Sequence, residues 1–171
     1  MPFIGRYTRY PIYPELGADP TKLTNIIGLS FEEETFLPGA ILNYQVKTAD
    51  SEIRLFDMDI EILDGELDFT IIEGATCVDG VTQVFTGSSD RNSLFVSTVY
   101  ASSDPTAIVG GFTLDSLEHF GLPTPILGFG NVPPLLLNYV TLKYNTNYIF
   151  RFENVGTATI IDHRFLLLWA E

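Results

Sequence analysis

The chain has 171 residues, the length of a single domain, which argues against a multidomain enzyme. Its 9 Lys and Arg residues against 22 Asp and Glu residues give a formal charge of -13 at pH 7. Such a surface is a poor one for phosphate backbones, so we expect no nucleic-acid partner. A hydrophobic fraction of 46% with 13 Phe and 8 Tyr excludes a disordered acidic chain. The longest apolar runs, such as residues 133–137, are far shorter than the ~20 residues of a membrane helix, so we expect no membrane partner.

Residues 1–25 differ in composition from the rest of the chain, because prolines, aromatic residues and cations gather there. Proline fixes φ and removes an amide donor, so this segment favours an extended path over a central strand or a helix. It is either a terminal segment packed on its own domain or an arm that docks on a neighbouring, acidic surface. The side chains suited to such a contact are Arg6, Tyr7, Arg9, Tyr10 and Tyr13.

Two runs with alternating apolar residues, 53–63 and 66–75, flank the dipeptide Asp64-Gly65. Asp-Gly between such runs is the strongest local signal for a β-hairpin, because a type I′ turn needs a positive φ at both central residues. In the resulting register Ile60 faces Phe69, and the apolar sets of both strands coincide on one side of the ribbon. We expect the opposite face, which faces solvent or a polar partner, to carry Asp57, Asp59, Glu61 and Asp68.

The middle of the chain reads as short β segments separated by turns. A second Asp-Gly at residues 79–80 predicts another turn, residues 94–100 predict a strand, and residues 114–120 are the only plausible helical turn. From residue 121 to residue 134 the sequence GLPTPILGFGNVPP interrupts the pattern. This loop either covers the sheet of its own subunit or forms a subunit contact through Ile126, Leu127 and Phe129.

Three regular strand candidates follow, at residues 136–143, 148–153 and 159–169. In the second candidate Tyr148, Phe150 and Phe152 share one face. The third candidate has an apolar stripe that also includes His163 and consists of Ile161, Phe165, Leu167 and Trp169.

These elements predict an all-β fold. Eight to ten strands without a helix long enough for a parallel crossover favour an antiparallel β-sandwich. A jelly-roll-like arrangement is the natural architecture at this strand number. We therefore expect an extended N-terminal arm, residues 1–25, and a single β-sandwich domain, residues 26–171.

Residues that carry catalysis are sparse in this sequence. His119 and His163 belong to no metalloprotease or nucleophile-elbow motif, and a cupin-like metal site would need ligands clustered on one strand. Cys77, the single cysteine, has no neighbouring His or cation and reads as a small apolar filler. We predict no enzyme activity, and therefore no catalytic residue, metal or cofactor.

The acidic residues of the predicted hairpin have three interpretations. Asp57, Asp59 and Glu61 lie two residues apart, which spaces their carboxylates by roughly 6.6 Å along a strand. That distance fits the paired carboxylates of glycoside cleavage, and equally a solvated acidic face, which we favour. The third interpretation is a calcium ion between Glu61 and Asp68, because two like charges directly across a ladder repel each other.

The C-terminal part of the chain resembles a known family. Residues 142–154 read LKYNTNYIFRFEN, and after a small-residue turn a strand ends in the residues LWAE, 168–171. With the DRNS segment at 90–93 and the glycine pair at 110–111, this pattern resembles head decoration, or cement, proteins of tailed bacteriophages over residues 75–171. The motif includes Tyr148, Arg151, Asn154 and Trp169.

The resemblance implies a virion structural protein without catalysis, a subunit that binds the outer surface of the assembled phage head and stabilises it. Its partners would be the major capsid protein and further copies of itself, as a homotrimer, and its location the exterior of the virion. The N-terminal arm and the apolar loop are then candidates for the contacts with capsid and neighbour. A receptor- or glycan-binding module of a phage fibre or tail stays open, because jelly rolls also serve as lectins, as does a cupin-like or glycan-cleaving enzyme.

Overall fold

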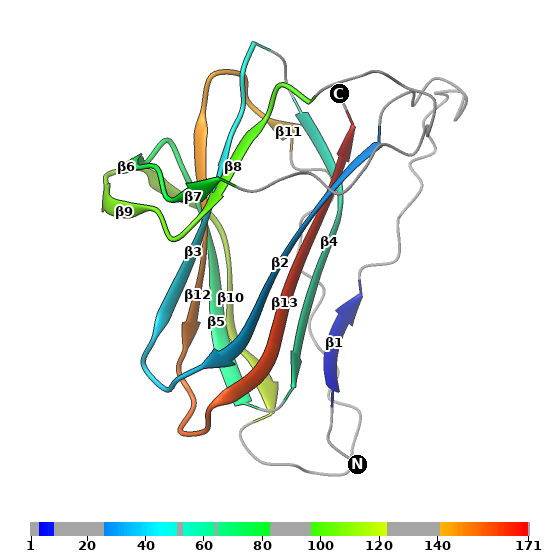
Figure 1. Ribbon diagram of the computed structural model, residues 1–171, viewed down its shortest axis with the longest axis vertical. Helices are drawn as coiled ribbons and strands as arrows, with labels where there is room; N and C mark the ends of the chain where they lie inside the picture. Colours follow the sequence, from blue (N-terminus) through cyan, green and yellow to red (C-terminus); the bar gives the residue numbers. More distant parts are fainter. Residues whose placement is uncertain are drawn as a thin grey trace.

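The computed structural model describes residues 4–8, 26–50, 53–63, 65–82, 97–122 and 141–170, and these contain strands and no helix (Figure 1). Each strand pair is antiparallel. The predicted all-β antiparallel class is therefore confirmed. The strands are β1 (Ile4–Thr8), β2 (Ile26–Phe36), β3 (Ile41–Lys47), β4 (Ile53–Leu63), β5 (Gly65–Glu73), β6 (Thr76–Val78), β7 (Val81–Thr82), β8 (Tyr100–Ser103), β9 (Thr106–Val109), β10 (Phe112–Leu122), β11 (Thr141–Leu142), β12 (Asn147–Asn154) and β13 (Ile160–Ala170).

The strands form two large sheets that face each other (Figure 1). The first sheet, sheet A, has the order β1-β4-β13-β2, and β11 also pairs with β4. The second, sheet B, has the order β10-β5-β12-β3-β8-β7. A separate two-stranded ribbon consists of β6 and β9. Two antiparallel sheets packed face to face are a β-sandwich.

Eight of the strands follow the order of a jelly roll. β2 pairs with β13, β3 with β12, β4 with β11, and β5 with β10. These pairs are nested, as if one long hairpin had been folded over itself, and the chain crosses between the sheets at each connection except that from β5 to β10. Such an eight-strand roll is the jelly-roll architecture that the strand number predicts.

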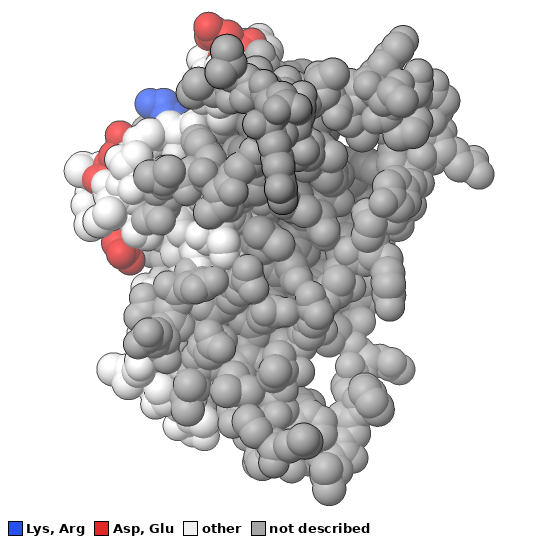
Figure 2. All heavy atoms as spheres, turned by 45° about the vertical axis from the view of Figure 1, so that its right-hand side comes forward, with Lys and Arg blue, Asp and Glu red and all other residues white. Residues whose placement is uncertain are grey.

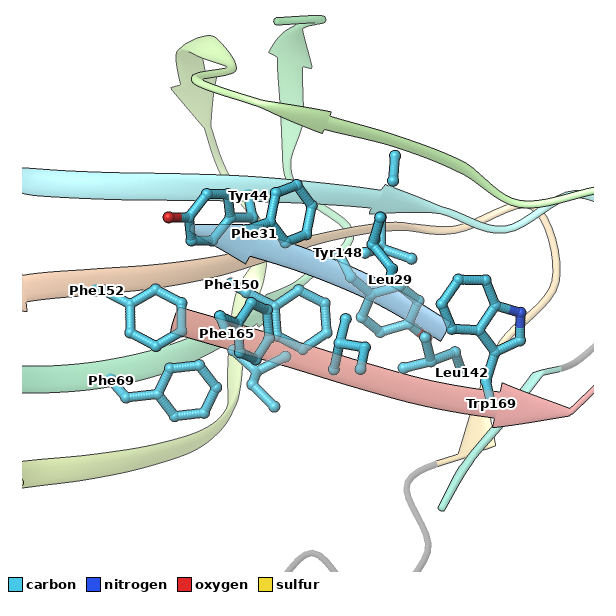
Figure 3. Packing of buried hydrophobic residues seen from close by; sticks show 14 of the residues in the cluster. Leu29, Phe31, Tyr44, Phe69, Leu142, Tyr148, Phe150, Phe152, Phe165 and Trp169 are labelled. Carbon is cyan, nitrogen blue, oxygen red and sulfur yellow. The ribbon is translucent and has the colours of Figure 1, made fainter. Parts of the chain in front are cut away.

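The core lies between the two sheets and is rich in aromatic rings (Figure 3). The ring of Phe165 on β13 lies 4.9 Å from that of Phe152 and 5.3 Å from that of Phe150, both on β12. Tyr148 is fully buried on the same face of β12, as the alternation predicts. The predicted stripe on β13 is confirmed for the side chains that the structure describes, which are buried: Phe165, Leu167 and Trp169.

The predicted hairpin at Asp64-Gly65 is wrong. β4 lies in sheet A and β5 in sheet B, so the two runs are not neighbours in one ladder. β4 pairs along most of its length with β13, and β5 with β12 and β10. β5 has long partners on both sides, and β4 has β13 on one side and the shorter β1 and β11 on the other. Both strands therefore satisfy more backbone donors and acceptors than in an isolated hairpin, whose outer edges stay unpaired. Long-range pairing therefore overrides the local turn signal.

The third interpretation of the acidic residues, a calcium ion between Glu61 and Asp68, is also wrong, because these residues lie in different sheets. In place of Asp68, the register puts Glu61 opposite Arg164 on β13 and Arg6 on β1. The acidic positions 57, 59 and 61 still alternate with the apolar positions 58 and 60 along β4, so they keep a common face in the ladder.

Several shorter predictions differ from the structure as well. The helical turn at residues 114–120 is wrong, because this segment belongs to β10, which contains two register shifts. The second Asp-Gly connects β6 to β7, which belong to different sheets. The strand at 94–100 is described only from residue 97 and becomes β8 at Tyr100, and that at 136–143 is described only from residue 141, as β11.

Candidate functional site

Two described parts of the fold lie outside the eight-strand roll: β1, which pairs with β4, and the segment between β5 and β10, residues 74–111, which we call the insertion. The insertion carries β6, β7, β8 and β9. β8 pairs with β3 and β7 with β8, so these two strands widen sheet B. The β6–β9 ribbon lies to the left of both sheets in Figure 1, away from the core.

Glycines mark the points at which the chain leaves and re-enters sheet B. Gly74 follows β5 with φ at 75°, and Gly110 and Gly111 precede β10 with φ at 71° and 84°. A Cβ at position 111 would lie 2.9 Å from the backbone nitrogen of Ala75 and from the carbonyl oxygen of Glu73. Only glycine therefore allows the two ends of the insertion to pass this closely.

A polar cluster fastens the insertion to the jelly roll. The buried amide of Gln45 on β3 donates through Nε2 to Asp79 Oδ1 and to Asn147 Oδ1, both at 3.0 Å. Its Oε1 accepts a bond from Ser102 Oγ on β8 at 2.7 Å. Both donors and the acceptor of this amide are therefore used. We call this cluster the glutamine clasp: Gln45, Asp79, Ser102 and Asn147.

Asn147 continues the clasp toward β6. Its Nδ2 donates to the carbonyl oxygen of Ala75 at 2.8 Å and to Cys77 Sγ at 3.3 Å. Cys77 is half-buried, so it takes a weak hydrogen bond here as well as filling space.

Four large apolar side chains, in the insertion and at the adjoining start of β10, are exposed to solvent. They are between 54% and 66% exposed. The described residues of the insertion contain two acidic residues, Asp79 and Asp104, and no Lys or Arg. Figure 2 shows one side of the molecule, on which the described residues are mostly neutral, with more acidic than basic atoms. The insertion surface, as we call it, consists of Val78, Val81, Val109 and Phe112.

A buried carboxylate lies close to this surface. Glu73, at the end of β5, is 4% exposed and receives Lys143 Nζ at 2.6 Å and Tyr148 OH at 3.1 Å. Tyr148 OH in turn accepts the backbone N–H of Lys143 at 2.8 Å. Burial, and the charge of Glu73 to a lesser degree, raise the pKa of Tyr148 to about 12. With a cation and a hydroxyl bound, Glu73 fixes the loop after β11 to the end of β5.

The predicted arm residues are only partly described. Arg6 and Tyr7 lie in β1, opposite Glu61 and Ile60 of the chain's own β4. In one row across sheet A the register aligns four residues of alternating charge: Arg6, Glu61, Arg164 and Glu32. Outside the described residues lie Arg9, Tyr10 and Tyr13, and likewise Ile126, Leu127 and Phe129 of the predicted subunit interface.

The family-like motif residues are mostly structural. Tyr148 and Trp169 are buried in the core. Asn154 is also buried, and its Nδ2 donates to the carbonyl oxygens of Phe36 and Ala158 at 2.9 and 3.0 Å. Arg151 is half-buried, and its Nε donates to Asn43 Oδ1 at 3.1 Å. These residues hold strands and turns together and do not gather into one exposed site.

Sequence reasoning missed the insertion surface. Its signal was present as valines beside the Asp79-Gly80 and Gly110-Gly111 dipeptides, in short strands that each pair on one side only, β6 with β9 and β7 with β8. Whether a valine is exposed, however, depends on the path by which the insertion returns to sheet B. The local sequence does not predict that path.

Among the residues that the structure describes, no three His, Cys, Asp or Glu side chains gather as metal ligands would, and no helix is present that could span a membrane. Comparison of the chain with protein-family models, with curated proteins and with solved structures gives no match.

Proposed function

We propose that this chain is a structural protein of a tailed-phage virion, which binds the major capsid protein on the outside of the assembled head and stabilises the head as a homotrimer. The observation that carries the proposal is the jelly-roll strand order, an architecture shared by viral capsid and lectin domains. Because a fold hosts many functions, the proposal also depends on the resemblance of residues 75–171 to head decoration proteins.

The charge of the chain supports a capsid partner of a particular kind. A net charge of -13 keeps free copies in solution and favours association with basic patches on a shell. Such association is steered by charge, so it weakens as salt screens it, with a screening length of about 10 Å at 0.1 M salt.

Co-sedimentation with undecorated phage heads tests the proposal. We expect the purified chain to sediment with the heads saturably, to bind less at 0.5 M than at 0.05 M NaCl, and to raise the temperature at which the heads break open. Absence of binding to heads, together with binding to a glycan array, would instead support the receptor- or glycan-binding module of a fibre or tail.

The role of the arm needs its own variants. Deleting residues 1–20 also removes β1 from sheet A, so the deletion is compared with the double variant Arg6→Ala/Arg9→Ala, which keeps the strand. Loss of head binding in both supports the arm as the capsid contact. Full binding by the deleted chain would show that the arm is not needed.

A further inference from the structure

We propose that the insertion surface, Val78, Val81, Val109 and Phe112, is where one copy of this chain meets a second copy. The inference deepens the proposed function and depends on it for the expected trimer, because it names the surface through which the subunits associate. It concerns a different contact from that with the capsid.

Exposure identifies the surface. Each of its four side chains is more than half exposed, and three of them lie on short strands outside the eight-strand roll. Single exposed apolar residues are ordinary, whereas a contiguous patch of them marks an interaction site. The pairing of β6 with β9 brings Val78 and Val109 into one ribbon. Apart from Asp79 and Asp104, the other exposed residues of the described insertion are small or hydroxyl-bearing, as at Thr76 and Thr106.

The distribution of charge favours a second copy as the partner at this surface. Two copies, each with a net charge of -13, repel each other wherever their acidic faces approach. The described insertion carries only two carboxylates, and one of them, Asp79, accepts a hydrogen bond from Gln45 in the clasp. Copies that meet here therefore bring fewer carboxylates together than copies that meet at the acidic positions 57, 59 and 61 of β4, whereas a basic partner such as a capsid patch is drawn to the acidic faces instead.

The backbone of the ribbon favours side-chain packing over addition of a strand. Ala107 in β9 has φ at 51°, and the β6–β9 register shifts beside it, since Thr76 faces Val109 while Val78 faces Thr106. One extra residue on β9 makes a β-bulge, a device that blunts a sheet edge against further pairing. A non-glycine residue in the left-handed region is costly and persists where the surroundings hold it.

The glutamine clasp presents this surface in a fixed position. Asn147 ties Cys77 of β6, and Asp79 ties the β6–β7 connection, to β3 and β12. A surface held before association loses less conformational entropy when a partner binds.

Sedimentation velocity over a concentration series tests the inference. We expect the wild-type chain to associate, and Val109→Asp to raise the dissociation constant at least tenfold, because it adds a charge to each side of the contact. The matched control is Leu37→Asp, since Leu37 is 58% exposed in the β2–β3 connection, and its association should equal that of wild type. Raising NaCl from 0.05 to 0.5 M should strengthen association, opposite to the effect on head binding.

A wild-type chain that is monomeric at all concentrations and salts, or equal association of Val109→Asp and wild type, would overturn the inference. Far-UV circular dichroism checks that Val109→Asp is folded, and Val81→Ser, a milder change on the same surface, should weaken association in the same direction. A monomer that still decorates heads would overturn this inference alone. Self-association without head binding would overturn the proposed function alone.

Discussion

At the scale of single residues, Glu73 shows how a charge is kept inside a β-sandwich. A buried carboxylate is costly unless it is paired, and Glu73 has both Lys143 and Tyr148 as partners. The alternation of β12 predicts that Tyr148 faces the core, but it does not predict the partner of its hydroxyl, which lies 75 residues away in the sequence. Such a contact depends on the long-range register of β5 with β12.

The raised pKa of Tyr148 predicts a fall in stability at alkaline pH. The phenol has a pKa of 10.0 when unperturbed and about 12 in the folded chain. The contribution of the protonated phenol to the unfolding free energy is fully present below pH 10. It is lost as pH rises toward 12, because the unfolded chain ionises first and the folded chain keeps its proton. Two pKa units correspond to roughly 2 to 3 kcal/mol of unfolding free energy.

Urea unfolding at pH 9 to 12 measures this loss. Tyr148→Phe should be less stable than wild type at pH 9, because Glu73 and the Lys143 amide lose a partner, yet its stability should fall less steeply above pH 10. Tyr144→Phe is the matched control, since Tyr144 is largely exposed, and it should follow wild type. If the unfolding free energies of Tyr148→Phe and wild type fell equally steeply above pH 10, Tyr148 would not be the cause of the fall.

At the scale of elements, the connection between β4 and β5 shows where local signals stop being sufficient. Asp64-Gly65 has the residues of a hairpin turn, and Gly65 does take a positive φ, at 95°. The same backbone conformation instead begins β5 in the opposite sheet. A turn dipeptide thus predicts that the chain bends, whereas the partner of each strand depends on which distant strands offer longer ladders.

Gly65 predicts a large destabilisation on substitution. A Cβ at this position would lie 2.5 Å from Cγ1 of Ile160, the first residue of β13, and φ is unfavourable for any other residue. Strain and overpacking together should make Gly65→Ala less stable by about 2 to 5 kcal/mol. At Gly39, φ is 73° but no atom lies within 4 Å, so Gly39→Ala should cost only about 1 to 2 kcal/mol. If Gly65→Ala and Gly39→Ala had equal midpoints of urea unfolding, the side chain of Ile160 would be able to move aside freely.

At the scale of the whole molecule, the sequence predicted the class and the architecture better than the pairing. Alternation on β12 and β13, with no helical periodicity of useful length, sufficed for an antiparallel sandwich. The count of strands sufficed for a jelly roll. The strand count did not predict the insertion, because β6 to β9 are only two to four residues long and distant side chains such as Gln45 and Asn147 help to hold them.

This difference predicts that the insertion opens without the jelly roll. The insertion has short ladders, exposed apolar residues and a polar clasp, whereas the roll has a continuous aromatic core. Segments of that kind unfold at lower free energy than the core. In native-state hydrogen exchange, we expect the amides of β6 and β9 to exchange through a local opening in which the roll stays intact.

Two variants separate the local opening from global unfolding. Asn154→Ala removes one donor from the buried carbonyl of Phe36 and one from the carbonyl of Ala158, so exchange in β13 should accelerate roughly tenfold or more. Exchange in β6 and β9 should stay within about twofold of wild type, because Asn154 keeps its bonds in the locally open state. Gln45→Ala breaks the clasp, whose bonds are lost both in the local opening and in global unfolding. It should therefore accelerate exchange in β6 and β9 and exchange in β13 by a similar factor. Equal acceleration of both regions by Asn154→Ala would mean that insertion and roll unfold as one unit, and that the surface carried by the insertion is as stable as the core.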